Sequence, residues 1–430
     1  VLVTQCCCGG IFLATFTPCP YNSEQIQVIL VGLRRRYMLR RSILISGISG
    51  LAAFSGLALA QSMSSSSAEK AMPYSRRPEV KKFIQDVCKR RGLDQNWVAA
   101  ILDQATYQPK IERLMTPKRA KPGTKDTRKD WEKYRNIFLG AHRLNLGVQF
   151  WKDNEVYLER AREIYHVDPA VIIGIIGVET RYGENTGSWK VLDSLVTLSF
   201  DYKRRADFFK KELEEFLVIL YNNDLKPFEV QGSYAGAVGL PQFMPSSIKR
   251  FGVDFDGDGK IDINHSTADT IGSIANYLSK HGWVEGLPML IEADISPAQA
   301  AKFGGGTNPR FTWNQLINNG VKPLDNADRF AGNMPVFIVD YPFYLPGSVD
   351  FEKLYRVGTK NFTAVLRYNS SYFYAGAVAE LGSAIAEMMG KKGLIDGEKL
   401  LPPHLKPQPS SIAGNINGIK ETVTPLSAGQ

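Results

Sequence analysis

Glu179 is the residue of this sequence best placed for acid–base chemistry, because it closes a long apolar run. Asp168 and Pro169 are a favourable N-cap and first helical residue, and residues 170–178 are apolar throughout. This pattern predicts a helix that is buried on all sides. Burial disfavours the charged form of a carboxylate, and a carboxylic acid that stays neutral near pH 7 can donate a proton. The alternative is a structural carboxylate that pairs with Arg181 or caps a turn.

A second polar cluster lies in residues 231–247, where Gly and Pro residues interrupt the chain before Gln242. This composition predicts a shaped loop rather than the interior of a helix or strand. Ser233 and Gln242 supply a hydroxyl and an amide, groups of the kind that position a sugar. Turn formation explains the same residues equally well, so this loop alone does not decide between the two interpretations.

The segment from residue 254 to residue 269 has the acidic spacing of a calcium-binding loop. Positions 1, 3, 5 and 9 of the loop are Asp254, Asp256, Asp258 and Asp262. Carboxylate oxygens are the hard ligands that Ca²⁺ prefers, and without a cation they would repel one another. Position 12 is His265 instead of Glu, so a longer loop would have to close on the ion through Asp269. Asp269 would otherwise only cap the following helix.

The elements that must position these residues are predicted to be mainly helical, with a small strand-containing insertion. A helix with apolar residues at helical spacing is expected to run from Pro78 to Gly92, and another from Tyr368 to Met389. We divide the chain as follows: 1–60 upstream extension and signal peptide, 61–77 flexible linker, 78–166 helical domain, 167–285 catalytic core with the acidic loop, 286–360 small β-containing domain, 361–392 helix completing the core and helical domain, and 393–430 disordered tail.

The N-terminal residues predict export. Met38 is a more natural start than the first residue, and a basic stretch at 39–41 precedes an apolar stretch at 43–59. Small residues at 58–60 complete the pattern of a cleaved secretory signal peptide, which would place the protein in the periplasm. A membrane anchor is the alternative, whereas no Cys follows the cleavage site to support a lipoprotein anchor. After cleavage only Cys88 remains, so no intramolecular disulfide is expected.

Composition and charge restrict the partners. The 430 residues are 44% hydrophobic and carry a formal charge of +9, a globular profile long enough for two or three domains. Removal of residues 1–60 lowers the net charge by four to +5, which suits a polyanionic partner. The sequence has no basic-aromatic motif of a nucleic-acid module, so no nucleic-acid partner is expected. The basic loop at 117–129 is either solvated or a contact with an anionic polymer.

Five segments, in their order and spacing, resemble the lytic murein transglycosylase B family. They are residues 177–183 (GVETRYG), 232–237 (GSYAGA), 242–247 (QFMPSS), the acidic loop at 254–269, and 367–370 (RYNS). The resemblance covers residues 78–389. It implies a mainly α (α+β) fold with a lysozyme-like catalytic core, a helical domain, a small β insertion and an EF-hand-like calcium loop. One departure is the Leu-Pro pair at 240–241, where the family leads us to expect a smaller or aromatic pair.

The resemblance also implies roles for the matching residues. Glu179 corresponds to the catalytic acid, and Arg204 and Arg205 correspond to a basic pair near the peptide stems of the substrate. The cleft-lining positions correspond to Ser233, Gln242, Tyr368, Asn369 and Tyr374. A structural Ca²⁺ would be held by Asp254, Asp256, Asp258, the carbonyl group of Lys260, and Asp269. No organic cofactor is implied.

The implied activity is cleavage of the β-1,4 bond between N-acetylmuramic acid (MurNAc) and N-acetylglucosamine (GlcNAc) in peptidoglycan glycan strands, with 1,6-anhydromuramoyl products. Ordinary glycosidases need two carboxylates, whereas one suffices if the substrate supplies the nucleophile. A lysozyme-type hydrolase and a non-catalytic, calcium-braced cell-wall binding protein are the alternatives. We expect the protein to be a monomer. The sequence does not decide whether it joins cell-wall synthesis complexes, or whether it cleaves glycan strands internally (endo) or from their ends (exo).

Overall fold

The computed structural model describes residues 72–116, 130–223, 225–326, 329–345 and 350–397. All of them belong to one compact unit, Glu69–Gln430. The expected signal peptide, most of the expected linker, the basic loop at 117–129 and most of the expected tail lie outside the described residues. Within the described ranges, no helix is long and apolar enough to cross a membrane.

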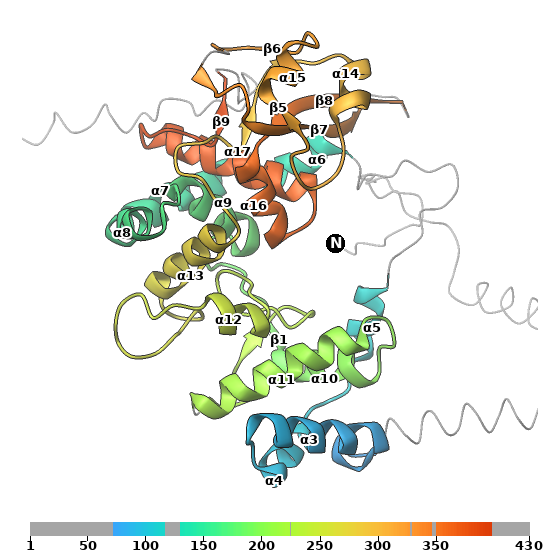
Figure 1. Cartoon of the computed structure of the whole chain (residues 1–430). Coiled ribbons are helices and arrows are strands. Elements are labelled where there is room, and N and C mark those ends of the chain that lie inside the picture. Colours follow the sequence, from blue (N-terminus) through green and yellow to red (C-terminus); the bar gives the residue numbers. More distant parts are fainter. Residues whose placement is uncertain (1–71, 117–129, 224, 327–328, 346–349, 398–430) are drawn as a thin grey trace, which may run out of the picture. The chain divides into compact units, whose positions relative to one another are not determined.

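The described chain is mainly helical, as the sequence predicts (Figure 1). Its helices are η1 (Tyr74–Arg76), α3 (Pro78–Arg91), α4 (Gln95–Asp103), α5 (Pro109–Met115), α6 (Trp131–Asn136), α7 (Ala141–Asp153), α8 (Glu155–Tyr165), α9 (Pro169–Thr180), α10 (Val191–Phe200), α11 (Ala206–Asn222), α12 (Pro245–Phe251), α13 (Thr267–Lys280), α14 (Pro297–Phe303), α15 (Trp313–Ile317), α16 (Lys360–Tyr368) and α17 (Tyr372–Met388). The helix predicted from Pro78 ends where expected, with Gly92 in the left-handed conformation that favours glycine.

The buried helix predicted before Glu179 is α9, and it lies at the centre of the core. All residues from Pro169 to Gly177 are buried, and α7, α8, α13 and α17 contact this helix. The contact with α17 is very close: a Cβ atom added to Gly174 would lie 2.4 Å from the carbonyl oxygen of Val378. A side chain at this position would therefore push the two helices apart. Burial of each Ile or Val in α9 contributes roughly 1.5–3 kcal/mol.

Strands are confined to short segments and one long hairpin. The hairpin consists of β7 (Pro335–Tyr344) and β8 (Phe351–Gly358), which pair antiparallel with Asp340 opposite Tyr355. Three short strands extend it to a five-stranded sheet in the order β5-β7-β8-β3-β9: β3 (Leu290–Ile291), β5 (Phe311–Thr312) and β9 (Ile395–Asp396). Two further short strands, β4 (Ala293–Asp294) and β6 (Lys322–Pro323), pair with each other. The five-stranded sheet lies largely in the insertion expected at 286–360.

Four buried charges join the sheet to the core helices. The Glu380 carboxylate on α17 accepts hydrogen bonds from Arg135 Nε on α6 (2.6 Å) and from Arg356 on β8 (2.8 Å). Arg356 also donates to Glu292, beside β3, at 2.7 Å. All four side chains are buried, so each charge depends on its partners in place of water. The network fixes α6, α17 and the sheet to one another.

Three expectations about the chain's organisation need correction. The linker expected at 61–77 is ordered at its end, where η1 begins and the buried Arg77 binds Asp201 at 2.9 Å. Residues 395 and 396, expected in the disordered tail that starts at 393, instead form β9, which pairs in parallel with β3. The helices expected as one domain at 78–166 pack in two places: α5 contacts α10, whereas α6 and α7 contact α17. Apolar periodicity predicts that a helix is buried but not which partner buries it.

The helix expected from Tyr368 to Met389 is also two helices. α16 ends at Tyr368 and α17 begins at Tyr372, with Ser371 as its N-cap. The Ser371 hydroxyl accepts a hydrogen bond from the backbone N–H of Tyr374. The chain thus turns at residues 369–371, where Asn and Ser side chains favour caps over helix interiors.

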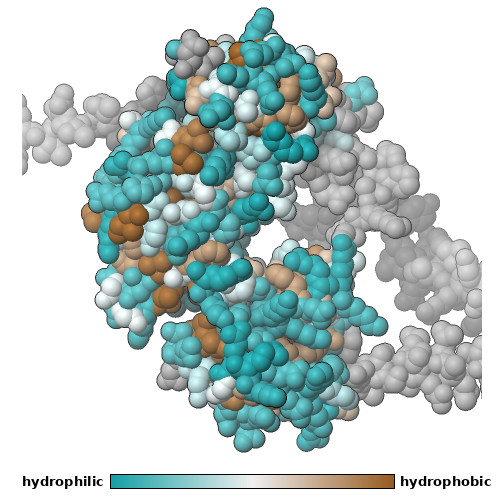
Figure 2. Space-filling view, in the orientation of Figure 1, coloured by the Kyte–Doolittle hydropathy of each residue, from teal (hydrophilic) through white to brown (hydrophobic). Residues whose placement is uncertain are grey.

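The surface of the described residues is mainly hydrophilic on the face shown in Figure 2, with hydrophobic residues scattered over it. Single exposed apolar residues of this kind, such as Val156 and Ile164, are usual in folded proteins. The apolar side chains of the central helices are instead buried in one large cluster. Stability should therefore depend on the interior, including the buried charges.

Replacement of Glu380 by Leu should lower the free energy of unfolding by about 3–5 kcal/mol, because it leaves two buried guanidinium groups without their carboxylate. Urea denaturation of the wild type and the variant would measure this loss. Glu132→Gln is the matched control, since Glu132 also binds Arg135 but its side chain is 47% exposed, and its loss should cost about 1 kcal/mol or less. Equal effects of the two substitutions would contradict the structural role given to the network.

Candidate active site

Glu179 lies in the last turn of α9 and is half-buried. The hydroxyl of Tyr374, from α17, donates a hydrogen bond of 2.7 Å to Glu179 Oε1. Burial raises the pKa of Glu179 from its ordinary 4.5 to about 7, and the Tyr374 hydrogen bond opposes this rise. Arg181, the partner considered from the sequence, binds Glu184 instead at 3.4 Å. The geometry therefore fits a proton-donating acid better than a structural ion pair.

The chain turns sharply directly after Glu179. Arg181 and Tyr182 both have positive φ angles, 52° and 57°, which non-glycine residues rarely adopt. The Tyr182 ring fills the space between α7 and α9, since a Cβ atom on Gly177 would lie 2.3 Å from its hydroxyl oxygen. The buried Thr180 hydroxyl donates to carbonyl groups and accepts the backbone N–H of Gly183 at 3.3 Å. These contacts hold the end of α9 and thereby the Glu179 backbone.

The N-terminus of α9 differs in one detail from the sequence prediction. Asp168 occupies the N-cap position, but its side chain makes no capping hydrogen bond. It accepts a hydrogen bond of 3.1 Å from the indole N–H of Trp283 instead. Burial raises the pKa of Asp168 above its ordinary value. Asp168 thus links α9 to the segment that follows α13.

The segment at 231–247 is largely a loop, as predicted, although it starts in a short strand and its last three residues begin α12 (Pro245–Phe251). It contains β2 (Gln231–Gly232), which pairs with β1 (Trp189–Lys190), and Val238 forms bridges to Gly232 and Phe243. The Ser233 hydroxyl accepts backbone N–H groups of Ala235 and Ala237, at 3.3 and 3.0 Å. Ser233 therefore takes part in turn formation, one of the two interpretations left open by the sequence.

Gln242 follows this turn with a positive φ of 48°. Its side-chain amide donates to the carbonyl oxygens of Thr186 (3.0 Å) and Gly239 (2.9 Å). These two bonds leave the side-chain carbonyl oxygen as an acceptor for another group. Pro241, the departure noted in the sequence, is buried, and its carbonyl group accepts the hydroxyl of Tyr368. A proline fits here because this contact uses its carbonyl group alone.

The aromatic residues of α16 and α17 meet at Glu179. The Tyr368 and Tyr374 rings are stacked with centroids 6.3 Å apart. Burial raises the pKa of both tyrosines, so their hydroxyls stay protonated donors at neutral pH. Asn369 is exposed in the turn between the two helices, next to Tyr368. The break between α16 and α17 thus places three of the expected cleft residues within a short segment.

A cavity of about 490 Å³ lies beside Gln242 and Tyr368. Arg205, Arg250 and Arg367 contribute cationic side chains to its lining. Arg205 precedes α11 and lies over the Phe208 ring at 4.3 Å. Arg204 is exposed and does not line this cavity, so only one of the two expected arginines is placed here.

Three of the expected metal ligands converge in the acidic loop. Carboxylate oxygens of Asp254, Asp256 and Asp269 lie within 4.8 Å of one another. The hydrogen bond from the Ser266 hydroxyl, at 2.7 Å, holds the pKa of Asp256 below its ordinary value. Asp269 is buried in the first turn of α13, and its oxygens accept backbone N–H groups of Phe255 and Asp262. This set of hard oxygen donors fits a calcium ion.

The remaining members of the loop are placed differently. Asp258 accepts the backbone N–H of Lys260 at 2.8 Å and is not part of the three-carboxylate group. Asp262 accepts the backbone N–H of His265 and lies 2.9 Å from its imidazole nitrogen. His265, at the position where Glu is usual, therefore closes the loop on itself rather than on the three carboxylates.

Two residues near Glu179 carry no distinct signal in the sequence. Tyr134, on α6, lies close enough that the Glu179 charge, together with burial, raises the pKa of its hydroxyl. Thr180 is fully buried and connects α9 to the loop through the Leu240 carbonyl oxygen. An aromatic residue on an amphipathic helix and a threonine after a glutamate are both common, so only the tertiary contacts distinguish them.

Comparison with known proteins identifies the family. Residues 75–383 match the family described as the transglycosylase SLT domain. The chain belongs to this family. It is 37% identical over 319 residues to the membrane-bound lytic murein transglycosylase B of Escherichia coli, an alignment that covers 73% of this chain and 84% of that protein.

Two solved structures of family members extend the comparison. The Escherichia coli lytic transglycosylase Slt35, solved in complex with calcium, is 35% identical with a TM-score of 0.64, over 74% of this chain and 96% of that chain. SltB3 from Pseudomonas aeruginosa, solved in complex with NAG-NAM-pentapeptide, is 28% identical with a TM-score of 0.60, over 71% of this chain and 78% of that chain. The fold of this chain is therefore that of lytic transglycosylases in the SLT family.

Tyr374→Phe should raise the pKa of Glu179 further, because it removes the hydrogen bond that favours the charged carboxylate. A carbon-13 NMR titration of the Glu179 carboxyl group would measure the change. Tyr372→Phe is the matched control, since the Tyr372 hydroxyl donates to the Gly306 carbonyl group instead. A lower pKa in Tyr374→Phe, or the same shift in both variants, would contradict the assignment.

Glu179→Gln should make the protein more stable at pH 8 and have little effect at pH 4.5. The pKa of Glu179 is raised on folding, so the unfolded chain releases this proton first and stability falls as pH rises from 4.5 to about 7. Above pH 7 the loss of stability is nearly complete and amounts to about 3 kcal/mol. Urea denaturation at both pH values would measure it, with exposed Glu184→Gln as the control. A stabilisation that does not depend on pH would contradict this account.

Proposed function

We propose that this chain is a lytic transglycosylase that cleaves the β-1,4 bond between MurNAc and GlcNAc in peptidoglycan, with Glu179 as its single acid and base. The observation that carries the proposal is the half-buried Glu179 carboxyl group in the last turn of α9, which accepts the Tyr374 hydroxyl and whose pKa burial raises to about 7. The family of the chain and its relatives, which are lytic transglycosylases, support the reaction class.

In the first step, protonated Glu179 donates its proton to the glycosidic oxygen as the C1–O bond breaks. Positive charge then develops on the muramoyl ring, as in other glycosidic cleavages. The N-acetyl group of the substrate and the oxygen atoms of Ser233 and Tyr374 ease this charge. Gln242 and Tyr368, which the structure holds by backbone hydrogen bonds, orient the sugar.

In the second step, the Glu179 carboxylate accepts the proton of the muramoyl C6 hydroxyl group, whose oxygen attacks C1. The 1,6-anhydro ring closes, and Glu179 is protonated again for the next cycle. The reaction consumes no water, so one carboxylate completes it. Glu184 is unsuited to act as a second acid because it binds His142 at 2.9 Å and Arg181.

The remaining site residues are assigned to binding. Asn369 lies beside Tyr368 and offers an amide to the glycan strand. Arg205, and at a greater distance from the cavity Arg204, would pair with carboxylate groups of the peptide stems. A lysozyme-type hydrolase would need a second carboxylate to activate water, and a non-catalytic binding protein would have no use for a neutral buried acid.

Digestion of peptidoglycan should release muropeptides that end in 1,6-anhydromuramic acid. Mass spectrometry would detect them, because they are lighter by one water than the reducing-end products of a hydrolase. Glu179→Gln should reduce their formation by more than about 10³-fold while the fold is retained, since general acid catalysis and its proton return are both lost. Retained cleavage in this variant, or reducing-end products from the wild type, would overturn the proposal.

A calcium ion would serve as a structural brace between the loop and α13. Asp254, Asp256 and Asp269 would bind it, with Asp258 and the Lys260 carbonyl group completing the site after a local adjustment. The calcium complex of Slt35, a member of the same family, supports this assignment. The ion supplies binding energy to the folded state and takes no part in the chemistry at Glu179.

Calcium should raise the thermal stability of the protein, by about 2.7 kcal/mol at a concentration 100 times its Kd. Asp256→Asn should weaken binding by at least about tenfold, because it removes one charged ligand. Asp294→Asn, an exposed carboxylate in β4, is the control and should bind calcium normally. Differential scanning calorimetry with and without calcium measures both. Stabilisation that is identical in wild type and Asp256→Asn would place the ion elsewhere.

The substrate and the expected export signal support a location in the periplasm. The relative in Escherichia coli is membrane-bound, and it is the reference against which the association of this enzyme with the cell envelope can be compared. The enzyme is proposed to act as a monomer on glycan strands, with no nucleic-acid partner and no organic cofactor.

A further inference from the structure

A second cavity, of about 620 Å³, lies apart from the residues proposed to cleave the glycan. Its lining includes neither Glu179 nor Ser233, Gln242, Tyr368 or Tyr374. Ligand pockets typically have volumes of roughly 300–1,000 Å³, apolar walls and a few polar groups. This cavity has that size, and its walls combine apolar residues with His265 and with charged residues of both signs, among them Asp262. No function follows for it from the proposed reaction.

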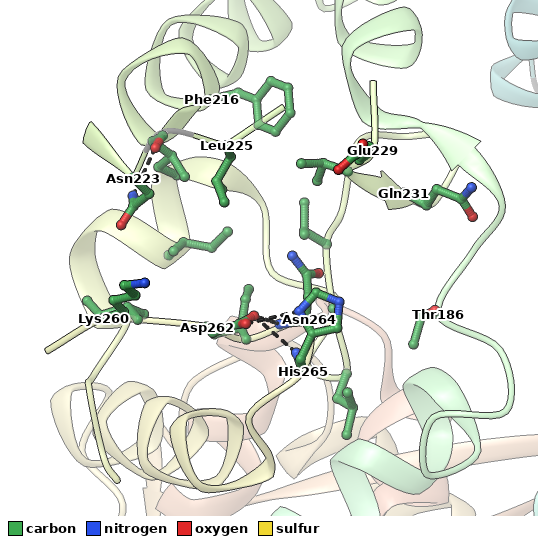
Figure 3. A pocket seen from close by; sticks show the side chains of 18 of the residues that line it. Thr186, Phe216, Asn223, Leu225, Glu229, Gln231, Lys260, Asp262, Asn264 and His265 are labelled. Atoms are coloured by element: carbon green, nitrogen blue, oxygen red, sulfur yellow. Dashed lines mark hydrogen bonds and ion pairs between the residues drawn. The ribbon is translucent and has the colours of Figure 1, made fainter. Parts of the chain in front are cut away.

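The walls come from three segments that are separate in sequence (Figure 3). The end of α11 contributes Phe216, the segment before β2 contributes Leu225 and Glu229, and the acidic loop contributes Lys260 and Asn264. The Phe216 side chain is buried, whereas Leu225 is 39% exposed at the rim. The cavity therefore offers an apolar interior with an accessible apolar edge.

Polar groups of opposite charge stand on different walls of the cavity. Lys260 and Glu229 stand on opposite walls, Asp262 and the Asn264 amide lie between them, and the Gln231 amide points outward at the edge of the cavity (Figure 3). Within the described residues, the side chains of Lys260, Gln231 and Asn264 make no hydrogen bond or ion pair. Glu229 is bound only by Lys226, in an exposed pair that water weakens. A ligand could use Lys260, Asn264 and Glu229 without breaking a strong internal contact.

We propose that this cavity is a second substrate site, which binds a short peptide that ends in a free carboxylate. The Lys260 ammonium group binds the carboxylate, the Asn264 amide binds a peptide group, and aliphatic side chains of the peptide lie against Phe216 and Leu225. The inference rests on the proposed function, because peptidoglycan supplies such peptides as the stems attached to its glycan strands.

The walls of the cavity also bear on the active site. Thr186 and Gly239 line it, and their carbonyl groups are the two acceptors of the Gln242 side-chain amide. A peptide in the cavity would contact the backbone whose carbonyl groups orient Gln242. A stem bound there would therefore hold the enzyme on the cell wall and restrain the loop that carries Gln242.

Isothermal titration calorimetry with a free stem pentapeptide tests the proposal, in the Glu179→Gln background so that no glycan chemistry intervenes. We expect saturable binding that weakens on the order of tenfold when the C-terminal carboxylate of the peptide is amidated. Lys260→Met and Leu225→Asp should each weaken binding of the free-acid peptide by a similar factor. Lys280→Met and Leu324→Asp, an exposed lysine and leucine outside the cavity, should not change it.

Absence of binding, equal binding of the acid and amide peptides, or binding unaffected by both cavity substitutions would overturn the proposal. The last result would place the peptide in the cleft near Arg205 instead. Circular dichroism of each variant confirms that it is folded. Glycan cleavage by the wild type is measured separately, so failure of this inference and failure of the proposed activity give different results.

Discussion

Desolvation of one carboxyl group is the constraint on which the site depends. Glu179 ends a helix whose other residues are almost all buried and apolar, so its charge has little water to stabilise it. The Tyr374 hydroxyl offsets part of this penalty without removing it. The resulting pKa, about 7, leaves the group able both to give a proton and to take one back near neutral pH. A single residue can then serve both steps of an intramolecular cleavage.

The rest of the structure holds this unfavourable group in place. The glycine contacts between α9 and α17 bring Tyr374 within hydrogen-bonding distance of Glu179. The buried charges around Glu380 fix α17 to α6 and the sheet, although such networks are costly to desolvate. The left-handed backbone at Arg181 and Tyr182 adds local strain directly after the acid. Strain and desolvation at the site are thus balanced by the packing of the apolar core, as is common for functional sites.

The sequence predicts local features well and tertiary partners poorly. The apolar run before Glu179, the mainly α class and the insertion with strands are visible in residue patterns, because periodicity reports burial directly. Tyr374 is 195 residues from Glu179, and no pattern within either segment indicates that they meet. The break at residues 369–371 was missed because a cap formed by Ser371 resembles a polar position within a helix. The cavity beside Lys260 draws on three distant segments, so it becomes visible only once they are folded together.

The central claim is that Glu179 acts as an acid because burial keeps it protonated near neutral pH. The rate of anhydromuropeptide release, measured as kcat/KM across pH 4 to 9, tests this most directly. The account predicts that the rate falls as pH rises through about 7, where the carboxyl group of the free enzyme loses its proton. A rate that already falls near pH 4.5, the ordinary pKa of a glutamate, would contradict it.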